Sequence, residues 1–182
     1  MPFDEINALK QRLQDAKQAD TAAFERSKGK YIDEVTDLLL MAYFYGQTDV
    51  MDQLGATLPM SERRVRAVLE QPVAGKTYKE RLSEYIEQGN LGDIDRVIET
   101  ETHRVYNQAA FEAAREAGAT MKTWNCMMLP TSRDSHVYLN DVTIPMDAAF
   151  YSINGGTTMF PGQWGIAEED VNCLCTLTFS KS

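Results

Sequence analysis

The chain has 182 residues, of which 43% are hydrophobic, so it can bury the core of one domain, alone or with a helical extension. It carries 18 Lys and Arg against 27 Asp and Glu, which gives a net charge of −9. Residues 125–182 contain only Arg133 and Lys181 as cations. Because phosphate binding needs Lys and Arg, this third of the chain is a poor nucleic-acid surface by itself.

The sequence predicts a protein without a membrane segment and without a secretion signal. The longest apolar run, residues 38–45, has eight residues, against the roughly 20 that a transmembrane helix needs. The first residues lack the basic and apolar order of a signal peptide. Three cysteines argue against a disulfide scaffold and favour a reducing compartment.

The sequence predicts helices over the first two thirds of the chain. Apolar residues recur every three or four positions over residues 4–18 and again over residues 20–45, where Gly46 is a plausible stop. Thr48 can cap a short helix that Gly55 ends. Ser61 can cap the next helix, which finishes before Pro72.

Residues 73–76 are predicted to form a connection, which two more helices follow. Thr77 and Glu80 have the spacing of a capping box, and Gly89 ends the helix that they begin. A long helix is expected over residues 93–117, with Gly118 as its stop.

After Gly118 the period changes to that of strands and loops. We expect a strand over residues 123–129, a turn over 130–134, an edge strand around 142–145 and an irregular loop over 152–165. Residues 172–179 alternate, which places Cys173 and Cys175 on one face of a strand. The predicted fold is α+β: a helical region, residues 1–75, followed by a small Gly-rich β-containing module within residues 76–182 that packs on the long helix.

Four polar residues follow one side of that helix: Thr100, Glu101, Arg104 and Asn107. Their spacing allows a buried polar seam that holds the Gly-rich module, or the lip of a site. The alternative is a solvated helix face with pairs inside the helix, and spacing alone favours this alternative.

Cysteine and histidine side chains suggest a second candidate site. Cys126, His136, Cys173 and Cys175 form a conceivable zinc set, but Cys-x-Cys is not the usual zinc spacing, and no second cysteine pair exists. The alternative is buried small cysteines beside a hydrogen-bonded histidine. We therefore expect no metal and no cofactor.

The alternative hypothesis for the same residues is an enzyme. His136 with Cys173 or Cys175 could activate a thiol or serve a metal-dependent hydrolase, and Arg104, Arg133 and His136 could serve a nuclease. Nothing in the sequence fixes either geometry, so we expect a protein without catalytic residues.

The Gly-rich loop offers an interaction site. Phe160 and Trp164 flank Pro161 and Gly162, and aromatic residues are enriched where proteins bind each other. The alternative is that the loop folds back and uses these rings as its own core.

Taken in order, these pieces resemble the bacteriophage head morphogenesis family, the minor head proteins of the Mu F type. The resemblance covers about residues 76–182, and its order of motifs is more specific than any one of them. Asp141 stands where the family usually has Gly, and Leu174 where it usually has Arg. The matching residues are Thr100, Glu101, Arg104, Asn107, Lys122, Trp124, Arg133, His136, Phe150, Pro161, Gly162, Asn172, Cys173 and Cys175.

The resemblance implies a virion protein present in few copies, assembled in the bacterial cytoplasm and lodged inside the phage head. Its partners would be the portal protein and the major capsid or scaffolding protein, with at most a weak contact to phage DNA and none to a membrane. Its role would lie in head assembly at the portal vertex or the inner capsid face, with some members affecting genome packaging or ejection. The family is not known for enzymes, although its domain is sometimes fused to toxin modules and has been compared with nuclease-like folds.

Overall fold

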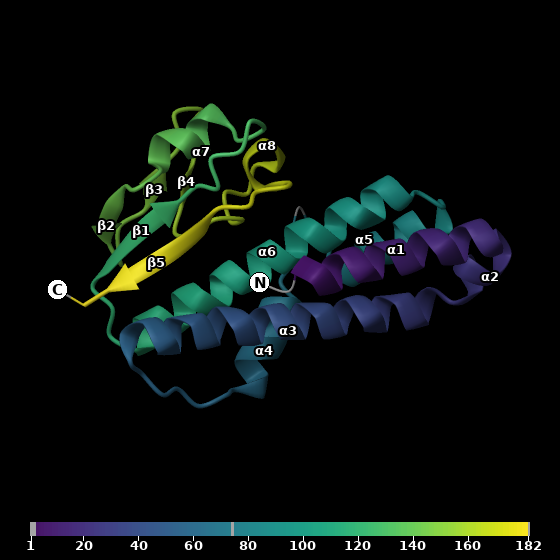
Figure 1. The fold of residues 1–182 in the computed structure, drawn as a ribbon, viewed down its shortest axis with the longest axis horizontal. Helices are drawn as coiled ribbons and strands as arrows, with labels where there is room; N and C mark the ends of the chain where they lie inside the picture. Colours follow the sequence, from purple (N-terminus) through teal and green to yellow (C-terminus); the bar gives the residue numbers. More distant parts are fainter. Residues whose placement is uncertain (1–2, 74, 182) are drawn as a thin grey trace.

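The computed structural model describes residues 3–73 and 75–181. Six helices come first and build an elongated bundle (Figure 1). Within it α3 and α6 lie side by side, α1 lies along both of them, and α5 packs on α6. The bounds are α1 Phe3–Ala19, α2 Thr21–Arg26, α3 Lys28–Leu54, α4 Glu62–Leu69, α5 Tyr78–Glu87 and α6 Leu91–Glu116.

The helix expected over residues 20–45 begins as predicted, but it is broken near its start and ends later than predicted. It is interrupted at Ser27, which separates α2 from α3, and α3 then continues through Gly46 and Thr48 to Leu54. Gly46 is therefore not a stop: a Cβ placed there would lie 2.3 Å from the carbonyl oxygen of Tyr106 on α6. The glycine is needed because two helix backbones meet at this point. Gly55, with φ of 60°, ends the helix as expected.

Caps at the other helix starts follow the sequence. Ser61 accepts a hydrogen bond from the Arg64 N–H at the start of α4. The Thr77 and Glu80 capping box that begins α5 is confirmed in both directions. Such caps satisfy backbone N–H groups that the first turn leaves unpaired.

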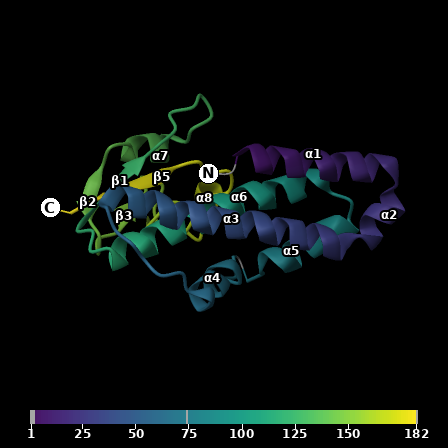
Figure 2. The same ribbon diagram turned by 60° about the horizontal axis from the view of Figure 1, so that its bottom comes forward.

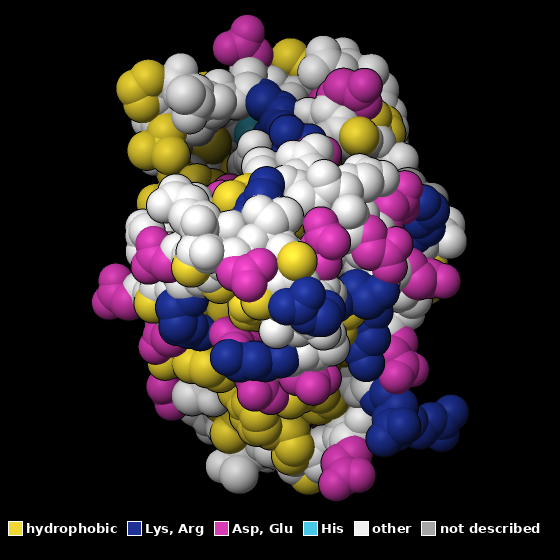
Figure 3. All heavy atoms as spheres, turned by 90° about the vertical axis from the view of Figure 1, so that its right-hand side faces the viewer, with side chains coloured by type: hydrophobic (Ala, Val, Ile, Leu, Met, Phe, Trp, Pro, Cys, Tyr) yellow, Lys and Arg dark blue, Asp and Glu magenta, His cyan; other side chains and the backbone are white. Residues whose placement is uncertain are grey.

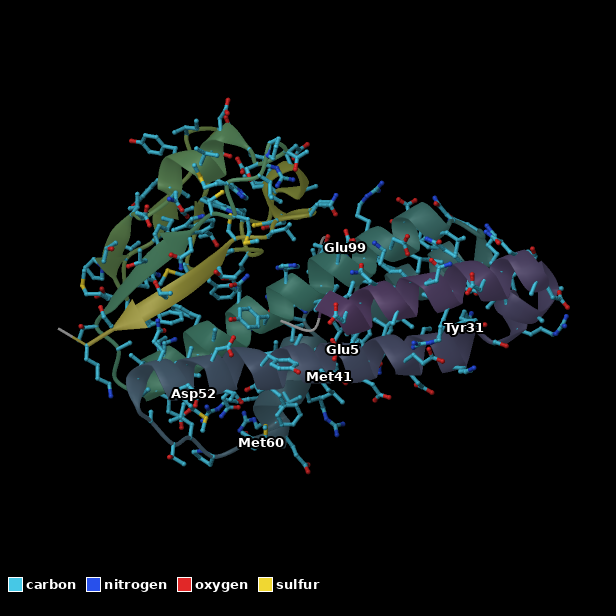
Figure 4. The ribbon with its side chains drawn as sticks, viewed as in Figure 1. Glu5, Tyr31, Met41, Asp52, Met60 and Glu99 are labelled. Carbon is cyan, nitrogen blue, oxygen red and sulfur yellow. The ribbon has the colours of Figure 1, made fainter. Side chains whose placement is uncertain are left out.

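Charged side chains tie the outer helix to the bundle. Lys10 on α1 lies 2.5 Å from a carboxylate oxygen of Glu99, and Figure 4 shows Glu99 on α6 beside α1. Met60 lies in the segment that leads from α3 to α4 below the bundle (Figure 4).

The C-terminal module contains two small antiparallel sheets and two short helices. The expected strand over 123–129 instead covers Met121–Asn125, and the one expected over 172–179 begins only at Thr176, so Cys173 and Cys175 precede it. The sequence did not predict α7 or α8. The larger sheet has the order β2-β1-β5, in which Met121 is paired with Pro145 and with Ser180. The edge position of the proline-bearing strand is confirmed. The elements are β1 Met121–Asn125, α7 Asp134–Leu139, β2 Thr143–Pro145, β3 Phe150–Tyr151, β4 Thr157–Thr158, α8 Ala167–Asp170 and β5 Thr176–Ser180.

Two hydrophobic clusters meet along α6. Its first half contributes Ile94 and Ile98 to the cluster of the helical bundle. Its second half contributes Phe111 and Ala114 to the cluster beneath the sheet. The module thus sits on the C-terminal part of α6, as Figure 1 shows, and the predicted α+β architecture is confirmed.

The surface carries both charges. On the end of the bundle that faces the viewer in Figure 3, Lys and Arg side chains are interspersed with Asp and Glu. Among the described helices, none combines the length and the apolar character needed to cross a membrane.

Candidate functional site

The polar residues of α6 are buried, which corrects the preference for a solvated helix face. The side chains of Glu101 and Arg104 are 0% and 2% exposed and pair with each other at 2.8 Å. Arg104 also donates to the backbone oxygen of Val68 at 3.0 Å, while Arg81 approaches Glu101 at 2.5 Å. The spacing missed this burial because it says nothing about what covers a helix face.

Two neighbouring residues on α6 hold the C-terminal segment. Asn107 donates to the backbone oxygen of Cys175 at 3.0 Å, and the hydroxyl of Thr100 accepts from the N–H of Asn172 at 3.3 Å. Gly162 lies against α6, since a Cβ there would lie 3.3 Å from the Cα of Arg104. Thr100 and Asn107 therefore hold the module on α6, whereas Glu101 and Arg104 join α6 to α4 and α5.

His136 of α7 faces both cysteines of the Cys-x-Cys segment. Its Nδ1 lies 3.6 Å from the Sγ of Cys173 and 3.4 Å from the Sγ of Cys175. All three residues are buried, and their ligand atoms lie within 4.8 Å of one another. The sequence suggested these residue types, and the fold brings three of the four members of the suggested zinc set together.

The other ring nitrogen of His136 faces a carboxylate that the sequence did not single out. Nε2 lies 2.9 Å from Oε2 of Glu169. Three side chains donate to that carboxylate: Ser135 at 2.8 Å, Ser152 at 2.9 Å and Asn154 at 3.1 Å. Glu169 is 2% exposed although it belongs to a run of three acidic residues, which looks like solvated surface in sequence.

These contacts decide where charge lies in the cluster. The contact with Cys175 lowers the pKa of Cys173, and His136 lowers it further, whereas the pKa of Cys175 is raised. Burial lowers the pKa of His136, but its contacts with Cys173 and Glu169 outweigh burial, and the net shift is upward. Burial raises the pKa of Glu169, but its three hydrogen bonds and His136 bring it below the usual value. The pair of cysteines therefore shares one readily ionised thiol beside an imidazole that is easily protonated.

The aromatic rings of the module surround this cluster instead of facing solvent. Trp124 is fully buried and packs edge-on against His136, with ring centroids 5.7 Å apart. Trp164 stacks on His136 at 6.3 Å and also packs against Trp124 at 5.8 Å, while Phe160 packs on Phe111 of α6 at 5.2 Å. Phe160 and Trp164 are buried, so the expectation that these rings dock a partner is corrected: the loop uses them as its own core.

Lys122 is a second buried charge in the module. Its ammonium group donates to the backbone oxygen of Met159 at 2.9 Å and lies 4.8 Å from the centre of the Phe111 ring. Burial lowers its pKa to about 8. Lys122 and Trp124 are thus two positions apart on β1, and both side chains are buried on the same face of the strand.

A small cavity of about 40 Å³ adjoins the cysteines and His136. Cys126, Arg133 and Leu174 also line it, but Arg104 does not. Cys126 lies outside the three-residue group whose ligand atoms approach one another. Arg133 donates to the backbone oxygen of Val171. The nuclease arrangement of Arg104, Arg133 and His136 is therefore not brought together in this structure.

Two motif positions have left-handed backbone conformations. Asp141 has φ of 62°, and Asn172 has φ of 56°. Asp and Asn are among the non-glycine residues that adopt this conformation most readily. Asp141 therefore adopts a conformation that glycine accepts readily.

Comparisons with known proteins agree with these motifs. One relative is the minor head protein GP7 of Bacillus phage SPP1, 32% identical over 95 residues, covering 50% of this chain and 31% of that protein. Another is the NAD(+)–arginine ADP-ribosyltransferase EFV of Enterococcus faecalis (strain ATCC 700802 / V583), 26% identical over 172 residues, covering 73% of this chain and 35% of that protein. The chain thus spans about a third of the length of these curated relatives. No solved structure matches.

A family model described as Phage Mu protein F like protein matches residues 63–178, a range that contains every motif residue discussed above. The chain therefore belongs to this family of bacteriophage head morphogenesis proteins.

Proposed function

We propose that this protein is a minor head component that works by binding, at the portal vertex or the inner face of the capsid, during head assembly. It would be assembled in the host cytoplasm and carried inside the virion, where it assists genome packaging or ejection. Its family and its similarity to a phage minor head protein support this role. In this proposal residues 76–182 form the family module, and residues 1–75 form the helices that support it.

The observation that carries the proposal is the inward direction of the motif side chains. Eight of the ten motif residues proposed as structural are buried, Arg133 is half-buried, and Asn172 is exposed. Glu101, Arg104 and Asn107 are engaged with other protein groups. Residues used in this way preserve a shape that a partner can recognise.

The surface that would bind the portal is the loop between β1 and α7. Met127, Met128 and Leu129 are 55%, 56% and 42% exposed, and they follow one another in a loop that projects from the module (Figure 2). Three adjacent exposed apolar side chains are costly in water unless a partner covers them. A second exposed apolar pair, Tyr151 and Ile153, lies at the β3–β4 hairpin.

A pull-down with purified portal rings tests the proposal. Wild-type protein should be retained, and replacement of Met127, Met128 and Leu129 by serine should reduce retention at least tenfold. The matched control replaces Tyr151 and Ile153 by serine, which removes exposed apolar area elsewhere and should leave retention unchanged. If wild-type protein does not bind portal rings, capsid shells or scaffolding protein, the proposal is wrong.

The enzymatic alternative is not proposed, although one relative is named a transferase. The cavity at His136 and the cysteines is about 40 Å³, whereas pockets for small-molecule ligands span roughly 300–1,000 Å³. Incubation with labelled NAD+ and an arginine-containing acceptor, and with DNA or RNA, should give neither transfer nor cleavage. A turnover that disappears in Cys173→Ser would overturn this expectation.

A further inference from the structure

We propose that His136, Cys173 and Cys175 bind one zinc ion, with a water molecule as the fourth ligand. This inference goes beyond the role in head assembly and does not depend on portal binding. It rests on four features of the structure: the distances between the ligand atoms, the two sulfurs facing one nitrogen, the support behind the histidine, and the cavity beside the cluster.

The distances fit tetrahedral zinc. With Zn–S and Zn–N bonds of about 2.3 and 2.05 Å, a sulfur and a nitrogen ligand are about 3.6 Å apart. The two observed separations from Nδ1 are 3.6 Å to Cys173 and 3.4 Å to Cys175. Both nitrogen–sulfur separations therefore match those around a bound ion, and the three ligand atoms all lie within 4.8 Å of one another.

One nitrogen of His136 lies close to two sulfurs. A histidine whose Nε2 carries the proton has one lone pair, on Nδ1. That lone pair can accept from one S–H group, yet two sulfurs lie within 3.6 Å of it. An ion at the centre would engage the nitrogen and both sulfurs together.

The surroundings of His136 match those of a metal ligand. Histidine ligands commonly donate the N–H of their second nitrogen to a carboxylate, which fixes the ring and its tautomer. Here Nε2 lies 2.9 Å from Oε2 of Glu169, although its N–H is not aligned for a hydrogen bond in this structure, and that carboxylate is itself held by Ser135, Ser152 and Asn154. A carboxylate held in place in this way is the kind of group that lies behind metal-ligating histidines.

The cavity supplies the remaining position and a route of entry. Its volume of about 40 Å³ adjoins all three ligands, and a single water needs roughly 10–15 Å³. Cys126 lines the same cavity but lies outside the close group, so we assign the fourth position to water. Two thiolates and an imidazole select zinc over calcium or magnesium, which prefer oxygen ligands.

The unusual Cys-x-Cys spacing is no obstacle in this fold. Both cysteines precede β5, and the third ligand comes from α7, 37 residues before Cys173. The ion would join α7 to the segment before β5, and neither of these belongs to the paired strands described above. It would therefore act as a cross-link within the module.

Titration of reduced, metal-stripped wild-type protein with Co²⁺ under anaerobic conditions tests the site directly. One equivalent should bind, with a thiolate-to-cobalt charge-transfer band and the intense visible bands of tetrahedral cobalt, and one equivalent of Zn²⁺ should abolish both. Zinc should also raise the melting temperature of the stripped protein. A wild-type protein that shows no charge-transfer band overturns the proposal, and this measurement needs no variant that might fail to fold.

Variants then assign the ligands. Cys173→Ser and Cys175→Ser should each lower cobalt affinity at least a hundredfold, whereas the matched control Cys126→Ser should leave affinity and spectrum unchanged. Glu169→Gln should keep the spectrum but lower affinity about 10–100-fold, as other losses of such support do. If Cys126→Ser abolishes binding while Cys175→Ser does not, the ligand set is wrong.

Discussion

Replacing Gly46 by alanine tests the contact between α3 and α6. The added Cβ would lie 2.3 Å from the Tyr106 oxygen and 3.2 Å from the Ala110 nitrogen. Both are backbone atoms of a long helix, so no side-chain rotation can relieve the overlap. The two helices must instead move apart, and the residues packed between them lose contact.

The expected magnitude follows from two opposing effects. Overpacking of a well-packed interior costs up to about 3 kcal/mol, and Gly→Ala inside a helix returns about 1 kcal/mol through helix propensity. The net loss is about 2 kcal/mol. For a chain of this size the melting temperature should fall by about 4–8 °C.

Gly29 provides the matched control on the same helix. It lies in α3, is exposed, and has no atom within 4 Å of the position that a Cβ would take. Gly29→Ala should therefore leave stability unchanged or raise it by up to about 1 kcal/mol. Thermal melts and urea unfolding of both variants measure the difference. If Gly46→Ala is as stable as Gly29→Ala, the close approach of the two helices is refuted.

Three further predictions concern buried polar groups and backbone conformation. Arg104→Ala leaves the buried Glu101 with Arg81 as its remaining charged partner, so unfolding experiments should show a loss of about 3 kcal/mol. Arg96→Ala breaks a largely exposed pair on the same helix and should cost less than about 1 kcal/mol. Equal losses in the two variants would contradict the burial of the Glu101–Arg104 pair. Burial lowers the pKa of His103 from 6.5 to about 4, so its contribution to stability is complete above pH 6.5 and declines as the pH falls through 4, by about 3 kcal/mol in all; denaturant unfolding at several pH values should show this decline, and His103→Phe should flatten it. Asn172→Gly should be neutral in thermal melts and Asn172→Val should cost about 1–2 kcal/mol, because φ of 56° suits glycine and excludes a branched side chain; a tolerated valine would show that the turn is not left-handed.

The helical part of the fold could be predicted from the sequence because it obeys local rules. Ser61, Thr77 and Gly55 act at helix ends, as caps and stops do in most proteins. Gly46 could not be read in the same way. A glycine that ends a helix and a glycine that admits a neighbouring helix look alike until the neighbour, here Tyr106, is known.

The short elements of the module were harder for the same reason. The α7 helix has six residues and no side-chain cap, so its periodicity is too brief to distinguish from a turn. The packing of Trp124 and Trp164 around His136 holds it in place, and such contacts are invisible to local patterns.

At the candidate site, residue types pointed to the correct side chains but not to their arrangement. His136, Cys173 and Cys175 stood out because histidine and cysteine are rare in this chain. Glu169 did not, since acidic residues are common and its neighbour Glu168 is exposed. The buried members of this acidic run, Glu169 and Asp170, are recognisable only when their hydrogen-bond donors, such as Ser135, are in place.

The sharing of α6 between two hydrophobic clusters has a consequence for how the molecule opens. Loss of α3 would uncover the face of α6 that Ile98 and Val105 occupy, and loss of the sheet would uncover Phe111 at the other end. If either half unfolded alone, α6 would expose apolar side chains to water, which is energetically unfavourable. Unfolding of the whole molecule should therefore be one cooperative transition. Amide protons along α6 would then exchange with solvent only through global unfolding. A change that destabilises one end of the molecule would also destabilise the other, because both ends pack on this helix.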